Sequence, residues 1–569
     1  MGNFKVKVLT NGDDALIIWD SGGKIPNCLG FALKRKRKRD GKVTDEVVST
    51  WVGFDGKQGV KPGTRKPSTE WPIQKLIWTD YIVEPGDEVQ YQVVAMTGTP
   101  DNLAEDATHK SQWTQPVKIS PDSESGISAY FNRGIALSQW LERRLPGSGK
   151  NPKKLKTVIG EVGNPVREFM GGELRKKMLA LLADALENGK TIYAILYELD
   201  DPELTKALIA FGKKRANIIL ANGSVKKKGE DQNKNARKEL RGKVTLYNRM
   251  LAPKALAHNK ILVVTDKTGK KAEAAWTGST NWTKTGLCTQ ANNGLLLDDA
   301  KAAAPFLEQW HRIKAAKDDT PPNLKDANST PAKTSLGGGK ATFWYTPLLE
   351  EADLENANQL INGAKEGILF LMFNPGPRGT LLNTIVERNS PSSPHYDPSL
   401  YIHGVVNQDP STTKNPVVGL FHRGNYQESN YDVVIPEGVG EQLAYWQKEM
   451  SRKGFLGGIG FAMIHSKVVL IDPFGDHPVV ITGSHNLGPK ASSKNDDNMV
   501  IIENAPRLAA MYAVNIMSLY GHYRWRFHMS QRSKNGAGHS WQGLETTDTW
   551  QNGYFSDKAK MRELAFWLK

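Results

Sequence analysis

The chain has 569 residues and a formal net charge of +15 at pH 7. One hydrophobic core cannot serve a chain of this length, so we expect roughly two to four domains. Cys28 and Cys288 are its only cysteines, which excludes a disulfide framework and a site built from several cysteines. The positive charge favours a polyanionic partner, such as nucleic acid or an anionic lipid surface; a basic surface that only aids solubility is the alternative.

The N-terminus and the apolar runs indicate where the chain works. Residues 1–7 have no apolar stretch after their charges, so a standard secretory signal is not expected. The longest apolar runs, such as residues 367–373, are too short to cross a bilayer. We therefore expect no transmembrane segment, and a location in the cytoplasm or export without a cleavable signal peptide.

Residues 1–115 are expected to form an all-β sandwich that serves as an accessory domain. β-rich runs alternate with turn signals along this part of the chain. Trp19 on an early strand and Tyr91–Ala95 on a late one resemble a fibronectin type III module. The basic run Lys34–Arg39 continues a strand and is either a polyanion contact or a solvated strand edge. Its alternate side chains would lie on opposite faces.

The rest of the chain alternates between helical and strand patterns. The expected elements of the first series are helices at 173–187, 202–214 and 300–316 and strands at 191–197 and 216–221. Those of the second series are helices at 354–364 and 505–520 and strands at 368–373, 400–406 and 417–421. Stretches at 114–126 and 317–340 are predicted linkers. The repetition predicts a duplicated α/β unit, at residues 127–316 and 341–530, followed by a C-terminal tail at 531–569.

Two copies of one motif lie in the two α/β units. Each has a His and a Lys two residues apart, an apolar run, an Asp and the sequence Gly-Ser-x-Asn. These residues are His258, Lys260, Asp266, Ser279 and Asn281 in the first copy and His465, Lys467, Asp472, Ser484 and Asn486 in the second. A His-x-Lys triplet alone is expected about once by chance, but two copies with the same sequel are specific. On a strand the His and the Lys point the same way, and each motif glycine would let the backbone approach a ligand closely.

The paired motifs suit the transfer of a phosphodiester. A neutral imidazole can attack phosphorus and form a phospho-histidine, and a second, protonated imidazole can give its proton to the leaving oxygen and later activate water. Two ammonium groups and two amides can bind the non-bridging oxygens and stabilise the charge of the transition state. Because this cationic set can do the work of a metal, we predict neither a metal nor another cofactor.

In these motifs the chain resembles the phospholipase D superfamily, over about residues 127–530. The resemblance implies that the two halves pack around a pseudo-twofold axis with one active site at their junction, so that a monomer suffices. It implies that His258 is the nucleophile and His465 the acid and base. It also implies that Asp266 and Asp472 are structural within the motifs.

Two departures from the family pattern concern acidic residues. Five residues, not four, separate the first motif's Lys from Asp266, which argues against a contact role for Asp266. The acidic residue that orients each His in the family follows Gly-Ser-x-Asn; here the second copy supplies Asp497, and the first offers only an amide, Asn293. We expect Asp497 to orient His465 and raise its pKa, and the amide to leave His258 neutral.

Other residues have both a functional and a structural interpretation. His403 and His422 could line the cleft, although histidines of the core or surface are more common. The cluster Phe343–Tyr345 could grip a substrate, but such a cluster is more often a core anchor. Arg524 and Arg526 could clamp an anion or form a salt bridge at a helix end.

The substrate is left open between lipid and nucleic acid. Relatives with both motifs in one chain more often act on lipids, which favours hydrolysis or transphosphatidylation of glycerophospholipids, with peripheral contact to an anionic membrane. The basic charge and the lack of an obvious interfacial helix favour a nuclease for DNA or RNA. Either activity would suit a toxin or a defence effector. A polyanion-binding protein with a decayed site is the non-enzymatic alternative, and the two intact motifs argue against it.

Overall fold

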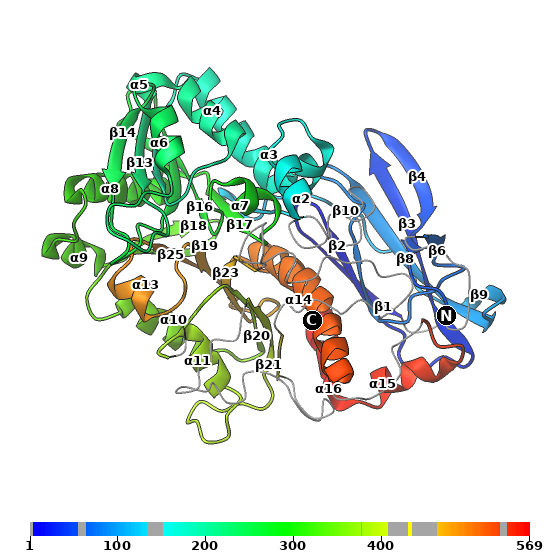
Figure 1. Cartoon of the computed structure of the whole chain (residues 1–569). Helices are drawn as coiled ribbons and strands as arrows, with labels where there is room; N and C mark the ends of the chain where they lie inside the picture. The colour runs from blue at the N-terminus through cyan, green and yellow to red at the C-terminus, as the bar shows by residue number, and fades with distance from the viewer. Residues whose placement is uncertain are drawn as a thin grey trace.

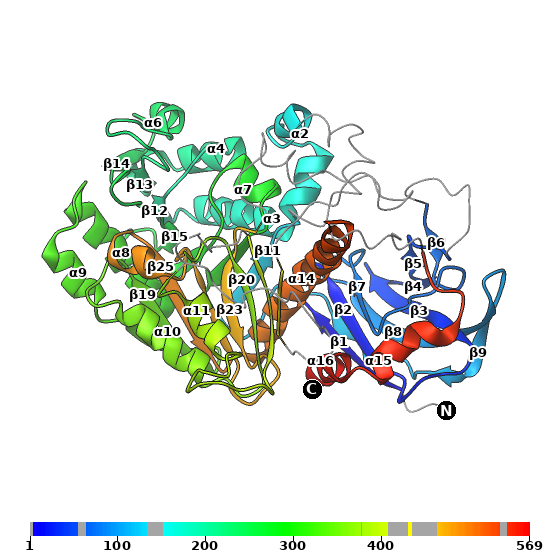
Figure 2. The same cartoon turned by 60° about the horizontal axis from the view of Figure 1, so that its bottom comes forward.

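The computed structural model describes residues 4–54, 64–133, 152–376, 378–407, 431–434, 464–534 and 543–569, with only the helical backbone at 525–534. The predicted strand at 417–421, His422 and the side chain of Arg526 lie outside this description. The N-terminal strands lie on one side of the long helix α14 (Pro506–Lys534), and two larger α/β sheets lie on the other (Figures 1 and 2). In the described ranges, none of the helices combines the length and apolar character that a membrane crossing requires.

The N-terminal module consists of antiparallel sheets around a shared hydrophobic core. The first sheet contains β1 (Lys5–Thr10), β2 (Ala15–Asp20) and β7 (Ile77–Asp80). The second contains β3 (Cys28–Arg39), β4 (Lys42–Val47), β8 (Glu88–Thr99), β9 (Asn102–Lys110) and β10 (Val117–Lys118), and a short pair consists of β5 (Ser49–Thr50) and β6 (Lys66–Pro67). Trp19 of β2 meets Phe31 of β3 edge-on at 5.7 Å between ring centroids, because alternate side chains of both strands point inward. The prediction of an N-terminal β domain is confirmed.

The arginines of the basic run on β3 are neutralised within this module. Arg35 is buried and contacts both Asp80 and Glu46. Arg39 binds Asp87, with 2.7 Å between Nε and Oδ1. Alternation along the strand puts these arginines on one face, as predicted. Their charge therefore stabilises the module and is not presented to a polyanion.

Two mixed sheets form the α/β part. The seven-stranded sheet has the spatial order β11 (Ile127–Phe131), β17 (Asn293–Leu297), β16 (Ala272–Gly278), β15 (Lys260–Thr265), β12 (Thr191–Leu196), β13 (Ala216–Ala221) and β14 (Thr245–Arg249). The eight-stranded sheet has the order β18 (Ala332–Leu336), β19 (Gly339–Tyr345), β25 (Asn498–Glu503), β24 (Val479–Gly483), β23 (Lys467–Ile471), β20 (Gly367–Met372), β21 (Tyr401–Val406) and β22 (Tyr431–Val434).

The same pairings occur in both sheets. The strand that begins with the motif lysine, β15 or β23, lies antiparallel to both of its neighbours. The next strands, β12 with β13 and β20 with β21, pair in parallel. The motif strands are buried along their whole length, which explains their continuous apolar runs. The predicted repetition of α/β units is confirmed.

The helices lie on the faces of these sheets and between them. In chain order they are α2 (Pro152–Val158), α3 (Pro165–Glu187), α4 (Pro202–Ala210), α5 (Gly212–Arg215), α6 (Lys234–Leu240), α7 (Lys284–Cys288), α8 (Ala300–Ala316), α9 (Pro322–Asn328), α10 (Ala352–Asn362), α11 (Leu381–Glu387) and α13 (Pro489–Ser493). Helix α3 begins earlier than the predicted start at 173. Its N-cap is Asn164, and Gly172 inside it has a φ of +53°, which kinks the helix. Because of this kink, the apolar residues before Gly172 do not continue the helical periodicity of residues 173–187, and the sequence did not predict these turns.

The segment predicted as a linker at 317–340 is largely ordered secondary structure. It holds α9 and β18, and β18 pairs with β19 at the edge of the eight-stranded sheet. The residues that suggested a linker have local roles here. Pro322 opens α9, where a missing N–H is tolerated. Gly337 and Gly338 have φ values of +61° and +83° and turn the β18–β19 hairpin.

The C-terminal tail joins the N-terminal module to the second sheet. It contains a 3₁₀ turn η1 (Asp548–Gln551), α15 (Asn552–Phe555) and α16 (Lys558–Leu568). Trp550 enters the N-terminal core, where its Nε1 donates to the Cys28 carbonyl at 2.8 Å. Phe566 of α16 stacks on Tyr401 of β21 at 4.4 Å between centroids. The tail is therefore part of the packing between the two modules.

Candidate active site

Both histidine–lysine pairs lie at the same end of a central strand. Lys260 is the first residue of β15 and pairs in register with Leu196 of β12. Lys467 is the first residue of β23 and pairs with Met372 of β20. Each histidine therefore lies two residues before the start of its strand, outside the sheet, where it can reach the other half.

The two motifs meet because each histidine is held by the opposite half. The His258 backbone N–H donates to the Asp496 carbonyl at 2.8 Å, and its Nδ1 lies 2.7 Å from Asp497 Oδ1. The His465 backbone N–H donates to the Ala291 carbonyl at 2.9 Å, and its Nδ1 lies 2.9 Å from Asn292 Oδ1. The loop after each Gly-Ser-x-Asn sequence thus crosses to the histidine of the other half.

This crossing corrects the predicted partners of the histidines. Asp497 was expected beside His465, and it binds His258 instead. Asn293 was expected beside His258, but its amide donates to Thr482 and Tyr512 of the second half, at 2.8 and 2.9 Å. The preceding residue, Asn292, is the one that contacts a histidine. The prediction failed because it assigned each orienting residue to the motif nearest in sequence.

The motif glycines allow a close approach of neighbouring backbone. Gly278 and Gly483 have φ values of +134° and +130°, in a region that favours glycine. A Cβ on either would lie 2.4 Å from the carbonyl oxygen of Asn293 or Asn498. The close approach predicted for these glycines is therefore to the adjacent strand, so their effect on a ligand is indirect.

The motif serines fix the residues that orient the histidines. Ser279 Oγ donates to Asn292 Oδ1 at 2.8 Å. Ser484 Oγ donates to Asp497 Oδ1 at 2.7 Å. Each serine thus holds an orienting residue of its own half, and that residue reaches across to the opposite histidine.

Each motif lysine contacts the backbone of its own histidine and lies beside an aromatic ring. Lys260 Nζ donates to the His258 carbonyl at 2.5 Å and lies 4.8 Å from the Tyr197 ring. Lys467 makes the same two contacts, with the His465 carbonyl at 2.5 Å and the Phe373 ring at 4.8 Å. These aromatic rings also flank the imidazoles, at 4.6 Å for Tyr197 and 4.9 Å for Phe373 between centroids.

Burial depresses the pKa values of all four cationic groups, and repulsion by neighbouring cations adds to this effect for His258, His465 and Lys467. Burial, aided by the charge of Lys260, lowers the pKa of His258 to about 4 against the opposing effect of Asp497. Burial also lowers the pKa of Lys260 to about 7. The pKa values of His465 and Lys467 are lowered by burial and then by the neighbouring cations. An anion placed among these groups would raise each pKa, so the electrostatics suit a phosphate group.

The motif asparagines differ in their surroundings. Asn281 Nδ2 donates to Glu198 Oε2 at 2.8 Å, and Asn486 occupies the corresponding position of the second motif. Glu198 lies two residues beyond the register partner of Lys260, where the second half has Asn374 beyond the partner of Lys467. Sequence reasoning missed Glu198 because it is not part of the motif, although the repeated strand register could have located it.

The motif aspartates hold turns. Asp266 is half-buried and accepts hydrogen bonds from the Thr268 hydroxyl and the backbone N–H of Lys270. Asp472 accepts from the backbone N–H groups of Lys365, Glu366 and Gly367. These contacts fix the end of each motif strand.

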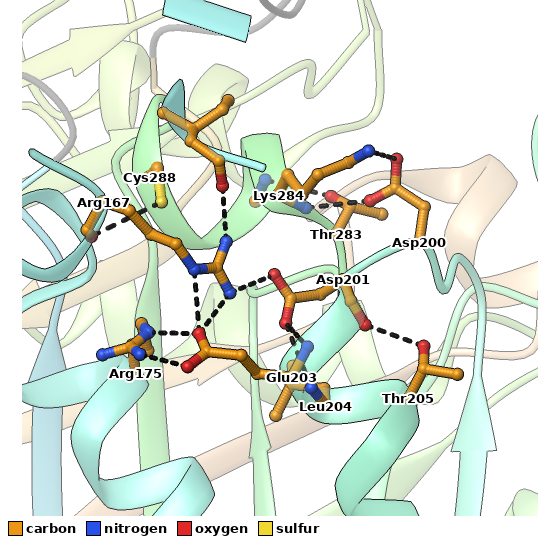
Figure 3. Close-up of polar contacts among 12 residues, drawn as sticks. Arg167, Arg175, Asp200, Asp201, Glu203, Leu204, Thr205, Thr283, Lys284 and Cys288 are labelled. Atoms are coloured by element: carbon orange, nitrogen blue, oxygen red, sulfur yellow. Dashed lines mark hydrogen bonds and ion pairs between the residues drawn. The ribbon is translucent and has the colours of Figure 1, made fainter. Parts of the chain in front are cut away.

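A buried ion-pair cluster supports the loop that follows Asn281 (Figure 3). Arg167 binds Asp201 at 2.6 Å and Glu203 at 2.6 Å, and Arg175 also binds Glu203. Asp201 caps α4, and its backbone N–H donates to the Trp282 carbonyl at 3.2 Å. Because Trp282 directly follows Asn281, the cluster ties the motif amide to the start of α4.

The remaining candidates have structural surroundings. The rings of Phe343–Tyr345 are buried in the core on β19, which confirms the core interpretation. His403 packs against Tyr401 at 3.9 Å between centroids. Arg524 on α14 binds Glu563 on α16 at 3.1 Å, in agreement with the salt-bridge alternative.

Comparison with known protein families finds a phospholipase D-like domain. The chain matches the family described as cardiolipin synthase, PLD-like domain, over residues 178–314 and 428–519. No curated protein matches the sequence. Similar solved structures include phosphatidylserine synthase of Haemophilus influenzae Rd KW20, with 10% identity over 63% of this chain and 91% of that chain and a TM-score of 0.41.

Two other structures are similar to parts of the chain. Polyphosphate kinase of Porphyromonas gingivalis has 13% identity over 60% of this chain, which spans 48% of the kinase, with a TM-score of 0.39. Nuc of Salmonella typhimurium, a phospholipase D family member, has 16% identity over 34% of this chain and 95% of Nuc, with a TM-score of 0.21. The two segments matched by the family each contain one motif. The chain therefore contains a phospholipase D-like domain, over the two matched segments.

Proposed function

We propose that this protein is a metal-independent phosphodiesterase that works through a phospho-histidine and acts on glycerophospholipids, by hydrolysis or by head-group exchange. One observation carries the proposal. The contacts of His258 with Asp497 and of His465 with Asn292 each join one half to the other, so both imidazoles and both motif lysines belong to one buried site.

In the first step, His258 is the nucleophile. Asp497 accepts a hydrogen bond from the Nδ1–H group of His258, so the proton stays on Nδ1 and the Nε2 lone pair is free to attack phosphorus. The new N–P bond forms as the ester P–O bond breaks, and His465 donates its Nε2 proton to the leaving alcohol oxygen. The ammonium groups of Lys260 and Lys467 and the amides of Asn281 and Asn486 stabilise the charge on the non-bridging oxygens.

In the second step, His465 acts as the base. It takes a proton from water or from an acceptor alcohol, whose oxygen attacks phosphorus while the N–P bond breaks. His258 leaves as the neutral imidazole, and His465 is protonated again, so the cycle closes. Water gives hydrolysis, and an alcohol gives transfer.

The partners of the two histidines support this order. The Asp497 carboxylate stabilises positive charge on the ring of His258, which N-phosphorylation creates. The amide of Asn292 provides no such charge, so the imidazolium of His465 gives up its proton more readily. The proposed roles of His258 as nucleophile and His465 as acid and base are therefore those expected from the sequence, but the reason differs. The carboxylate of Asp497 lies beside the nucleophile and not beside the acid.

We further propose that residues 127–316 and 341–530 are two halves related by an approximate twofold axis. Support comes from contacts that recur in both halves, such as those of Lys260 and Lys467 with their own histidines' carbonyls. Because one chain supplies both motifs, a monomer has a complete site.

The lipid substrate is supported by the matched family, which is described by cardiolipin synthase. The net charge of +15 favours a second candidate, a nuclease. The test incubates the purified protein in EDTA with mixed phospholipid vesicles and a primary alcohol, and in parallel with single- and double-stranded DNA and RNA. A phosphatidyl-alcohol product that disappears in both His258→Ala and His465→Ala is expected. Cleavage of nucleic acid with intact lipid would overturn the lipid assignment.

A further inference from the structure

Glu198 places a second carboxylate in the site, besides that of Asp497. It is partly buried at the end of β12, next to Tyr197, whose ring packs on His258. It accepts hydrogen bonds from two amides, those of Asn281 and Gln232. Since Asn281 is a proposed contact of the phosphate oxygens, its NH₂ group can bridge the bound phosphate and Glu198.

Burial opposes the ionised form of Glu198. It raises the pKa of this carboxyl, against the attraction of Lys260 and the hydrogen bonds from Gln232 and Asn281. A buried carboxylate without a full counter-charge is costly. An anionic phosphate bound at Asn281 adds to this cost, because it draws on the charge of the same Lys260.

A cation carried by the substrate would offset this cost. The amide of Asn281, a proposed contact of the phosphate, donates to Glu198 Oε2 at 2.8 Å, so a cationic group on a short alcohol of the bound diester would lie near this carboxylate. A nucleic acid strand has the opposite effect, because each neighbouring phosphate adds negative charge close to Glu198.

Resting on the proposed function, we propose that Glu198 is a specificity-determining residue that selects phosphodiesters with a cationic amine on one of their alcohol groups, such as ethanolamine phospholipids. The two halves divide the work. The second half has the neutral Asn374 at the corresponding position, so that position does not discriminate by charge.

The test compares short-chain monomeric lipids, which avoids effects of surface charge. The full-length protein is assayed with dihexanoyl phosphatidylethanolamine and dihexanoyl phosphatidylglycerol, and kcat/KM is measured for each. We expect the wild type to prefer the ethanolamine lipid, and Glu198→Gln to reduce the ratio of the two kcat/KM values about tenfold or more, as for loss of a charged hydrogen bond. Glu230→Gln, which removes an exposed charge from the loop near Gln232, should keep the ratio of the wild type.

The outcomes separate the two proposals. If the wild type turns over both lipids without preferring ethanolamine, or if a folded Glu198→Gln keeps the wild-type ratio, the inference about Glu198 is wrong and the proposed function stands. If the wild type turns over neither lipid, the proposed lipid function itself fails. Thermal unfolding of each variant shows whether it is folded. If Glu198→Gln does not fold, the lipid preference of the wild type still tests the inference.

Discussion

At the scale of single residues, Asp497 distinguishes the two histidines. It is fully buried and shares its carboxylate between His258 and the hydroxyl of Ser484. Although burial opposes this, the charge of His258 keeps the pKa of Asp497 below its usual range. The carboxylate is therefore ionised when His258 becomes positively charged, which is when its field lowers the barrier most.

Replacing Asp497 tests this role. Asp497→Asn removes the charge but keeps the size of the side chain, and we expect kcat/KM to fall by about 10- to 100-fold, as for other residues that orient a reacting group. The matched variant is Asn292→Asp, which puts a carboxylate on His465 instead. We expect it to raise the pKa of His465 and shift the pH profile. If Asp497→Asn has the kcat/KM of the wild type, the proposed role of Asp497 beside the nucleophile is wrong.

The depressed pKa values predict an acidic optimum for kcat/KM. As pH falls through the pKa of His258, about 4, the ring is protonated and cannot attack. As pH rises through the pKa of Lys260, about 7, the ammonium loses the charge that binds phosphate. His465, the acid of the first step, also loses its proton as pH rises, because burial lowers its pKa. Since kcat/KM reports the free enzyme, its pH profile should be a bell with its maximum between these two values. A profile that still rises above pH 8 would show that Lys260 keeps its charge.

At the scale of elements, the loop that carries Asp497 is anchored by a fully buried ion pair. Arg249, at the end of β14, binds Asp496 with both Nε and Nη2, at 2.8 and 2.9 Å. The same guanidinium contacts the carbonyl groups of Lys317 and Asp319. The loop of the second half is thus fixed to the first half beside His258.

Breaking this pair should destabilise the protein and the site together. Arg249→Ala leaves the Asp496 carboxylate buried without its partner, and we expect a loss of about 3–5 kcal/mol in the free energy of unfolding. Urea denaturation measures it. The control is Arg312→Ala, which removes an exposed pair with Glu308 and should cost less than about 1 kcal/mol. Equal losses in the two variants would contradict the anchoring role.

The elements of the site were largely predictable, and their cross-connections were not. The periodic apolar runs located β15 and β23, and the motif spacing placed a His and a Lys at the start of each. The sequence could not show that the loops carrying Asn292 and Asp497 exchange partners, because that depends on how two distant strands pack. The second linker was misread for a related reason, since its prolines and glycines are compatible with both a linker and a short helix followed by a hairpin.

At the scale of the whole molecule, α14 and the tail hold the N-terminal module against the α/β part. Helix α14 contacts β1 and β11 as well as β20 and β21, and the tail returns beside it to the N-terminal strands (Figure 2). Arg507 at the start of α14 donates to the Thr10 carbonyl at 2.6 Å. The sequence of the tail gave no signal for this role. Residues 531–558 are mostly polar, and the short amphipathic pattern after them predicts a helix without showing what it packs against.

Removing the tail's anchor should loosen the N-terminal module. Trp550 is buried among residues of both N-terminal sheets, so Trp550→Ala should cost about 3–5 kcal/mol in stability. The measurement is the free energy of unfolding from urea titration, with limited proteolysis to locate the opening. Met561→Ala, at an exposed site of α16, should change stability by less than about 0.5 kcal/mol. An unaffected Trp550→Ala protein would show that the tail does not anchor the module.

Covalent trapping tests the central claim, that two histidines from opposite halves share one site with His258 as the nucleophile. A 4-nitrophenyl phosphodiester needs little help from an acid, so His465→Ala should still form the N–P bond but lack the base that releases it. Mass spectrometry at alkaline pH should then find the phosphoryl adduct on the peptide that contains His258, and none in His258→Ala. An adduct on His465 in the His258→Ala variant would contradict the account, and so would turnover by a protein that lacks both imidazoles.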